Sequence, residues 1–203
     1  MSPFRDSMRR IAQGMQTCEE WLELVRDLEE PIHSGQAPAD LRMRWARRED
    51  LFAINALEGF VKETEFMEQS LSKGDRCLLL EDERGICAFA WVTFRDFKLA
   101  LWYTLKLDPG WSYLVYIFVH PAYARQGIAS HLLGSLMEDL RDRGCRRMIS
   151  GMYSNWKASL GLHKKMGFRI RRRLSQCKIL KIFPTPPREG AGDPDPPDLS
   201  QGD

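Results

Sequence analysis

The arrangement of apolar and polar positions is clearest in the middle of the chain. Residues 113–119 form an uninterrupted apolar and aromatic run, which is too short for a globular helix and is typical of a buried strand. His120 and Pro121 end this run, because proline cannot donate a hydrogen bond to a sheet ladder. Apolar residues then recur every three or four positions from Ile128 to Leu140, which predicts an amphipathic helix with one buried face.

The same two patterns predict strands and helices along the rest of the chain. Helical spacing predicts helices over residues 4–30, 47–57, 61–71 and 158–166. Alternating or β-rich runs between turn residues predict strands over residues 41–46, 76–80, 86–94, 99–106, 146–152, 168–173 and 174–183. We therefore expect an N-terminal helical extension with a linker over residues 1–40, one α+β domain over residues 41–183, and a tail over residues 184–203.

The composition fits one globular domain with appendages. The chain has 203 residues, of which 43% are hydrophobic and 29% are charged. The tail is rich in proline, glycine and acidic residues, which predicts that it is disordered. The net charge is +2, and the acidic tail leaves a mild positive excess on the rest of the chain. This excess suits an anionic cofactor better than nucleic acid, so we expect no nucleic-acid partner.

Cysteine and histidine usage argues against disulfides and metal sites. The five cysteines show no paired spacing and the four histidines are scattered, so we expect reduced thiols and no metal. The N-terminus lacks the apolar stretch of an export signal, and no apolar run approaches the length of a membrane span. These features predict a cytoplasmic protein without membrane contact. Residues 1–40 could pack on the main domain or on a second copy of the chain, which would form a homodimer.

The junction between the central strand and its helix has the features of an anion site. Gly127 stands immediately before the helix, whose first backbone N–H groups have no intrahelical partner. The helix dipole adds partial positive charge there, and Arg125 adds a full charge. A pyrophosphate group is a natural ligand for this place, although a single glycine can also serve only to let the chain bend.

Two motifs carry a resemblance to a known family. The motif VHPAYARQGIA at residues 119–129, followed by Asn155 and by LHKKMGF at residues 162–168, resembles the GCN5-related N-acetyltransferase (GNAT) superfamily over about residues 41–183. The resemblance implies a mixed, mostly antiparallel, twisted sheet flanked by helices, here with an extra N-terminal helix. It also implies that acetyl-CoA, as co-substrate, gives its acetyl group to a primary amine.

The resemblance further implies which residues contact the coenzyme. The implied contacts are the backbone groups of Ile117, Phe118 and Val119 for the pantetheine arm, the residues Arg125, Gln126, Gly127, Ile128, Ala129 and Ser130 for the pyrophosphate, and Asn155 and Ser159 for the thioester side. His163 would face the thioester sulfur.

The chain departs from the family pattern in four places. Ala124 stands where the turn usually begins with Arg or Gln, although Arg125 follows it. His163 stands where Tyr is commoner, and Asn155 lies one residue farther from Ser159 than expected. Residues 113–119 carry no carboxylate, which leaves the general base open because this strand frequently holds it in the family.

Two side chains are the first candidates for catalysis. Histidine can donate a proton near neutral pH, so His163 could protonate the leaving thiolate, or it could simply pack against the coenzyme. The candidate bases are Tyr116, which we take first, Tyr153, and the glutamates Glu58, Glu63 and Glu65 acting through water; positioning alone could also suffice. Two functions stay open: an N-acetyltransferase for a small-molecule or protein amine that the sequence does not name, or a catalytically silent domain of the same fold that binds acyl-CoA or a partner.

Overall fold

The structure, a computed structural model, describes residues 16–35, 40–60, 64–100, 103–179, 183–184 and 188–191. Its strands are β1 (Gln16–Asp27), β2 (Arg42–Trp45), β3 (Arg76–Asp82), β4 (Gly85–Thr93), β5 (Phe97–Ala100), β6 (Tyr103–Leu105), β7 (Trp111–Val119), β8 (Arg147–Tyr153), β9 (Arg169–Ile179), β10 (Phe183–Pro184) and β11 (Arg188–Ala191). Its helices are α2 (Leu51–Asn55), α3 (Thr64–Ser72), α4 (Ile128–Asp142) and α5 (Lys157–Lys165), with 3-10 turns at Arg48–Asp50 and Pro121–Tyr123.

One mixed sheet forms the centre of the molecule. Its strands follow the order β10-β9-β1-β8-β7-β4-β3-β2, and β11 also pairs with β9. The β7–β8 pair is parallel, while the other described pairs in this sheet are antiparallel. Strands β5 and β6 form a separate hairpin. The predicted fold class, a mostly antiparallel sheet flanked by helices, is therefore confirmed.

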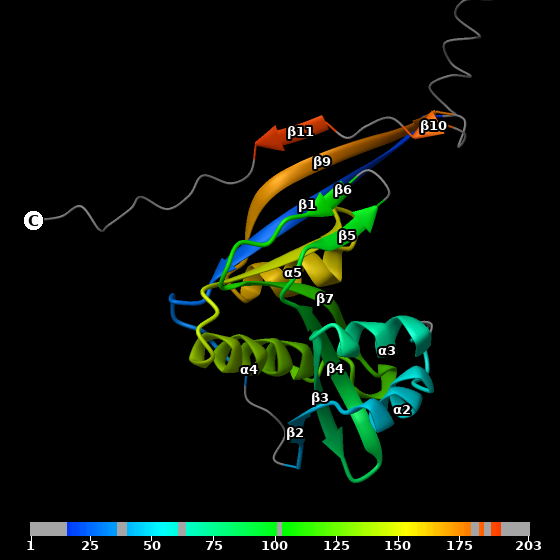
Figure 1. The fold of residues 1–203 in the computed structure, drawn as a ribbon, viewed down its shortest axis with the longest axis vertical. Helices are drawn as coiled ribbons and strands as arrows, with labels where there is room; N and C mark the ends of the chain where they lie inside the picture. The colour runs from blue at the N-terminus through cyan, green and yellow to red at the C-terminus, as the bar shows by residue number, and fades with distance from the viewer. Residues whose placement is uncertain are drawn as a thin grey trace, which may run out of the picture.

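Helices cover both faces of this sheet. Leu78 and Leu80 of β3 belong to the core that contains the apolar side of α4, whereas Cys77 and Leu79 belong to the core under α2 and α3. Because successive side chains of a strand point to opposite faces, α4 must lie on one side of β3 and the α2–α3 pair on the other. Figure 1 shows β3 and β4 passing between these two groups of helices.

The predicted central strand and helix are both present. The helix α4 buries the predicted apolar face, namely Ile128, Leu132, Leu133, Leu136, Met137 and Leu140. Gly144 follows the helix with a φ of 85°, in the left-handed region that glycine adopts without steric penalty. The burial of this face fixes the orientation of the helix start beside the end of β7.

The N-terminal extension is not helical where the structure describes it. Residues 16–27 form β1, which is antiparallel to β8 on one side and to β9 on the other. The predicted helix over residues 4–30 is therefore wrong for this part, and residues 4–15 lie outside the described residues. An interior strand buries both faces, so its apolar residues need not alternate with polar ones. Here Leu22 and Leu24 are buried on one face, and the partly buried Trp21 and Val25 lie on the other.

Three smaller predictions also need correction. The single strand expected over residues 99–106 is instead the β5–β6 hairpin, which begins earlier, at Phe97. The two strands expected after residue 168 are one strand, β9, over Arg169–Ile179. Disorder from residue 184 onward is wrong for Arg188–Ala191, which pair with residues 172–175 of β9 as β11. In each case the pairing with another strand, either adjacent or distant in the sequence, determines which residues form a strand.

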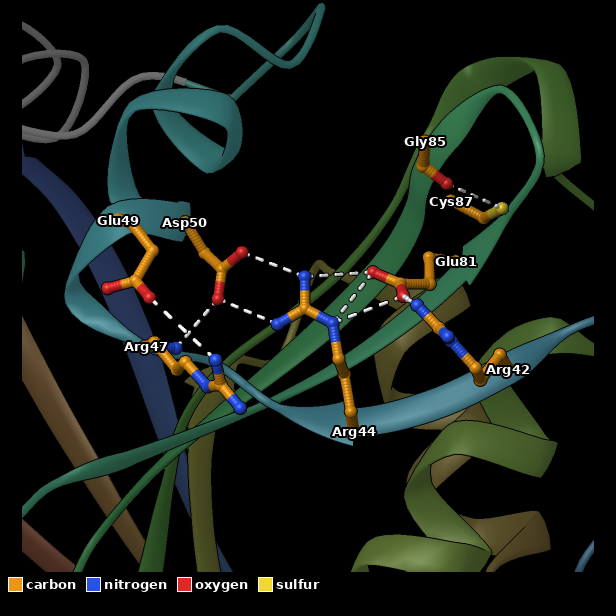
Figure 2. A network of polar contacts seen from close by, with 8 residues as sticks. All are labelled: Arg42, Arg44, Arg47, Glu49, Asp50, Glu81, Gly85 and Cys87. Atoms are coloured by element: carbon orange, nitrogen blue, oxygen red, sulfur yellow. Dashed lines mark hydrogen bonds and ion pairs between the residues drawn. The ribbon is translucent and has the colours of Figure 1, made fainter.

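Arg44 of β2 forms hydrogen bonds with Asp50 of the 3-10 turn and with Glu81 of β3 (Figure 2). Its guanidinium donates two hydrogen bonds of 2.7 Å to the carboxylate of Asp50 and one of 3.0 Å to that of Glu81. Hydrogen bonding by Arg44 holds the pKa of Asp50 below its ordinary value. Arg42 also donates to Glu81, at 2.5 Å. Since carboxylates already satisfy these arginines, we assign the cluster a structural role.

The segment after β1 crosses α4 at close range. A Cβ atom on Gly134 of α4 would lie 2.7 Å from Cα of Ser34, so only glycine allows this approach. His131 of α4 and the carbonyl oxygen of Gly35 lie within hydrogen-bond distance, with Nδ1 at 2.9 Å from that oxygen. The crossing therefore holds residues 34–35 against the first half of α4.

This crossing predicts a difference between two glycines in helices. Gly134→Ala should lower the free energy of unfolding by about 1–3 kcal/mol, because the added methyl group overpacks a backbone contact. Gly161 of α5 is a matched control, because a Cβ atom there meets nothing within 4 Å. Gly161→Ala should raise stability by about 0.5–1 kcal/mol through helix propensity. Urea unfolding measures both, and a Gly134→Ala variant as stable as wild type would show that the crossing is not tight.

Candidate active site

The parallel strands β7 and β8 part halfway along their length. Ladder pairs join residues 111–114 of β7 to residues 147–150 of β8, and the last described pair is Leu114 with Ser150. At this point β7 also carries a bulge toward β4, since Trp91 pairs with Tyr116 and Val92 with Leu114, leaving Val115 unmatched. A bulge bends its strand and increases the local twist. The remaining part of β7 therefore follows β4 and leaves β8.

A cavity of about 390 Å³ occupies the place where the two strands part. Its walls combine Tyr113, Tyr116 and Ile117 of β7 with residues 150–152 of β8 and with Ser159 and His163 of α5. Further aromatic walls come from Trp21 of β1, Phe66 of α3, Phe97 of β5 and Trp156 before α5. Apart from tyrosines, the ionisable side chains among these described lining residues are Lys98 and His163.

The predicted turn lies between the end of β7 and the start of α4. Arg125 and Gly127 both have positive φ angles, 60° and 79°, and Gly127 is the residue before the first helical turn. Arg125, Gln126 and Gly127 are exposed, whereas the side chains of Ile128 and Ser130 are buried. Any contact of Ile128 or Ser130 with an anion must therefore come from their backbone N–H groups. The geometry thus fits an anion at this helix start.

Two other segments of the chain lie against this turn and the residues next to it. The hydroxyl of Tyr123 donates a 2.5 Å hydrogen bond to Asp82 at the end of β3, and the guanidinium of Arg84 lies 5.3 Å from the Tyr123 ring. The bond to Asp82 raises the pKa of Tyr123 to about 12. A Cβ atom on Gly35 would lie 3.5 Å from Cβ of Ser130, so the segment after β1 borders the turn on another side. No local pattern in the sequence indicates that either segment lies there.

His163 is buried and presents one nitrogen without a partner. Its side chain is 1% exposed, and Nδ1 lies 2.8 Å from the carbonyl oxygen of Ser159. A carbonyl can only accept, so Nδ1 carries the hydrogen and Nε2 keeps its lone pair. Nε2 is buried and has no hydrogen-bond partner in the described part of the chain. Burial lowers the pKa of His163, so the ring is neutral at neutral pH and acts first as an acceptor.

The other predicted residues divide into those at the cavity and those away from it. Tyr116, Ile117 and Ser159 line it. Phe118 stacks on Phe89 in the core under α2 and α3, and Val119 packs against the core under α4. Asn155, the other residue predicted for the thioester side, is exposed and is not part of the cavity wall. Of the alternative bases, Glu58 and Glu65 are also exposed and away from the cavity, and Glu63 lies outside the described residues. Tyr153 contacts Trp21 and Trp156 edge to face.

Sequence reasoning missed the aromatic walls that come from distant elements. Trp21, Phe66 and Phe97 belong to β1, α3 and β5, and neither spacing nor motif connects them with the central strand. The aromatic enrichment near residue 97 was the available signal, and such enrichment indicates packing more often than a binding wall.

A sequence model of the acetyltransferase (GNAT) family matches residues 40–168, which is more than half of the chain. The chain belongs to the GNAT family. The match includes the strand β7, the glycine turn, α4 and His163, so the lining residues of the cavity lie within the matched region except for Trp21 of β1.

Two curated relatives are acyltransferases with amino-acid substrates in their names. The chain is 29% identical over 104 residues to the L-methionine sulfoximine/L-methionine sulfone acetyltransferase of Salmonella typhimurium, covering 50% of this chain and 56% of that protein. It is 35% identical over 60 residues to the L-amino acid N-acyltransferase MnaT of Escherichia coli, covering 30% and 35%. This GNAT chain therefore spans little more than half of one relative and about a third of the other.

Solved structures support the fold. A GNAT N-acetyltransferase from Sphaerobacter thermophilus superposes with a TM-score of 0.62 at 16% identity, covering 87% of this chain and 56% of that one. The ribosomal-protein-S18-alanine N-acetyltransferase of Escherichia coli gives a TM-score of 0.51 at 19% identity, covering 63% and 76%. At these identities the likeness concerns the fold alone.

No group of three or more His, Cys, Asp or Glu side chains among the described residues is placed to hold a metal ion. No helix within the described ranges has both the length and the apolar character needed to cross a membrane.

Proposed function

We propose that this protein transfers an acetyl group from acetyl-CoA to the primary amine of an amino acid or a related small molecule. The observation that carries the proposal is the cavity between the parting strands β7 and β8, which has His163 in its wall. The strand β7 runs from this cavity toward the turn at Gly127, where α4 begins. Membership of the GNAT family supports acetyl transfer, and the curated relatives named above support an amino-acid acceptor.

The described residues fit acetyl-CoA as co-substrate. The pyrophosphate would accept hydrogen bonds from backbone N–H groups at residues 126–130, assisted by Arg125. The pantetheine arm would lie along the part of β7 that no longer pairs with β8, where Ile117 lines the cavity. This arrangement would bring the thioester to the cavity, near Ser159 and His163.

His163 would carry the proton that the reaction must move. The amine nitrogen forms the new C–N bond, the C–S bond breaks, and one proton leaves the amine while one joins the thiolate. The neutral ring presents its Nε2 lone pair and so can accept the amine proton and then return it to sulfur. This role includes the donation to thiolate that the sequence suggested, and it adds a prior acceptance step. Tyr113 is a poor base, because burial raises its pKa.

The acceptor side of the cavity favours an uncharged or anionic molecule with an apolar part. Trp21, Phe97 and Trp156 provide aromatic surface, and Lys98 provides a cation that can pair with a carboxylate. The described lining residues include no carboxylate, so a polycationic acceptor would find no counter-charge there.

Release of coenzyme A in the presence of an amine panel tests the proposal. The panel contains L-methionine sulfone, apolar and aromatic L-amino acids, their amides, a polyamine and a peptide with a free N-terminus. We expect release of coenzyme A with the amino acids and a weaker response with the amides, which lack the carboxylate. Binding of acetyl-CoA without turnover on any amine would instead support a catalytically silent acyl-CoA-binding domain.

The lowered pKa of His163 predicts how kcat depends on pH on the acid side of neutrality. The neutral ring is the active form, and its pKa lies below the ordinary histidine value of about 6.5. At saturating substrates, kcat should hold as pH falls through 6.5 and drop only at lower pH. His163→Gln should lose this break. A wild-type break above 6.5, or the same break in the variant, would assign it to another group.

A further inference from the structure

The N-terminal strand places a tryptophan at the point where β7 and β8 part. Trp21 of β1 pairs with Tyr153 of β8, and its indole lies over Gly151. A Cβ atom on Gly151 would lie 2.4 Å from Cζ2 and 3.0 Å from Nε1 of this ring, so the ring can take this position only over glycine. Gly151 is the first β8 residue beyond the last described pair with β7, and both Trp21 and Gly151 line the cavity.

Two residues that line the cavity, Trp21 and His163, each have a buried polar atom, and the two atoms are of opposite character. The indole Nε1 of Trp21 and the imidazole Nε2 of His163 are both buried, and neither has a hydrogen-bond partner among the described residues. The indole nitrogen can only donate, whereas Nε2 of the neutral histidine can only accept. Buried polar groups without partners are rare and unfavourable in proteins. A bound molecule with an acceptor atom and a donor atom would satisfy both.

We propose that the Trp21 Nε1–H group donates a hydrogen bond to the carbonyl oxygen of the acyl thioester. The inference rests on the proposed function, because it assumes that the thioester lies in this cavity. When the amine attacks, this oxygen gains negative charge and its bond to the indole N–H strengthens. The charge returns to re-form the C=O bond as the C–S bond breaks. Trp21 is therefore a catalytic residue that the N-terminal strand contributes to the site.

Packing alone accounts for the ring but not for its nitrogen. The Trp21 ring contacts Tyr153 edge to face, with centroids 5.2 Å apart. Phenylalanine could make this contact as well, and it would leave no buried N–H group. Replacement of Trp21 by phenylalanine therefore separates the two roles, because it keeps an aromatic ring and removes the donor.

A pair of coenzyme ligands tests the hydrogen bond without turnover. Acetyl-CoA has the thioester carbonyl, and S-ethyl-CoA has a methylene group in its place. Calorimetry on the wild-type chain should show a three- to tenfold preference for acetyl-CoA, about the value of one hydrogen bond. In Trp21→Phe the preference should fall to about twofold or less, and kcat should drop about 10²-fold, as after loss of one oxyanion donor.

Two further variants complete the experiment. Trp45→Phe makes the same chemical change at a ring that does not line the cavity and that contacts the guanidinium groups of Arg76 and Arg143, and this variant should keep the preference for acetyl-CoA. Gly151→Ala displaces the indole without removing it and should also lose the preference for acetyl-CoA over S-ethyl-CoA. This second variant tests the role of the indole N–H if Trp21→Phe does not fold.

The outcomes separate this inference from the proposed function. A Trp21→Phe or Gly151→Ala variant that folds and keeps both the ligand preference and kcat would overturn the role of Trp21, while wild-type turnover would still support acetyl transfer. A wild-type chain that binds neither ligand would contradict the proposed function, and with it this inference.

Discussion

Replacing His163 with glutamine should lower kcat for amine acetylation by about 10²-fold, while acetyl-CoA affinity stays close to that of the wild-type chain. Glutamine fills much of the same space but cannot take up and release a proton. His163 lines the cavity, its buried Nε2 atom has a lone pair and no hydrogen-bond partner among the described residues, and the bond from Nδ1 to Ser159 fixes the orientation of the ring. Steady-state kinetics with the best amine, and calorimetry with acetyl-CoA, measure the two quantities.

His33→Gln is the control for this experiment, because His33 is exposed and does not line the cavity. It should leave kcat and affinity unchanged. A His163→Gln variant with wild-type kcat removes His163 from the mechanism, and Tyr116 becomes the next residue to test. A fall in affinity at constant kcat would show that His163 only packs against the coenzyme.

Replacing Gly127 with glutamate should weaken acetyl-CoA binding by about 10²-fold, the value of one hydrogen bond to a charged group at the upper end of its range. The φ of 79° at Gly127 disfavours any residue with a Cβ atom, so the turn would shift. The added carboxylate would also repel the pyrophosphate at the helix start. Calorimetric titration of acetyl-CoA gives the affinity.

Gly144→Glu is a matched control at the opposite end of the same helix. Gly144 also has a positive φ, 85°, and a Cβ atom at either glycine would meet nothing within 4 Å. The strain and the added charge are therefore alike, but only Gly127 lies at the proposed phosphate site. Equal affinities in the two variants would contradict the assignment of that site.

Local patterns in the sequence were sufficient for most of the fold. The apolar run at 113–119 and the helical spacing from Ile128 to Leu140 each depend on one element, and the structure contains both. The strand β1 could not be recognised in this way. Trp21, Leu24, Val25 and Leu28 fit helical spacing, and the partners that make the segment a strand, β8 and β9, lie more than a hundred residues later.

The candidate site likewise has one part that local sequence patterns could predict and another that they could not. The turn around Gly127 was predictable, because a glycine between a strand and a helix is a local signal with a direct electrostatic consequence. The aromatic walls were not, because Trp21, Phe66 and Phe97 meet only after the sheet and its covering elements assemble. The tautomer of His163 was also beyond the sequence, since it depends on the Ser159 carbonyl one turn earlier in α5.

A crystal structure of the chain with bound coenzyme A tests the central claim most directly. We predict that the pyrophosphate accepts hydrogen bonds from the backbone N–H groups at the start of α4, next to Gly127. The pantetheine arm should enter between β7 and β8 and bring its sulfur into the cavity beside His163. Coenzyme A bound elsewhere on the molecule, with the space between β7 and β8 unchanged, would contradict this account.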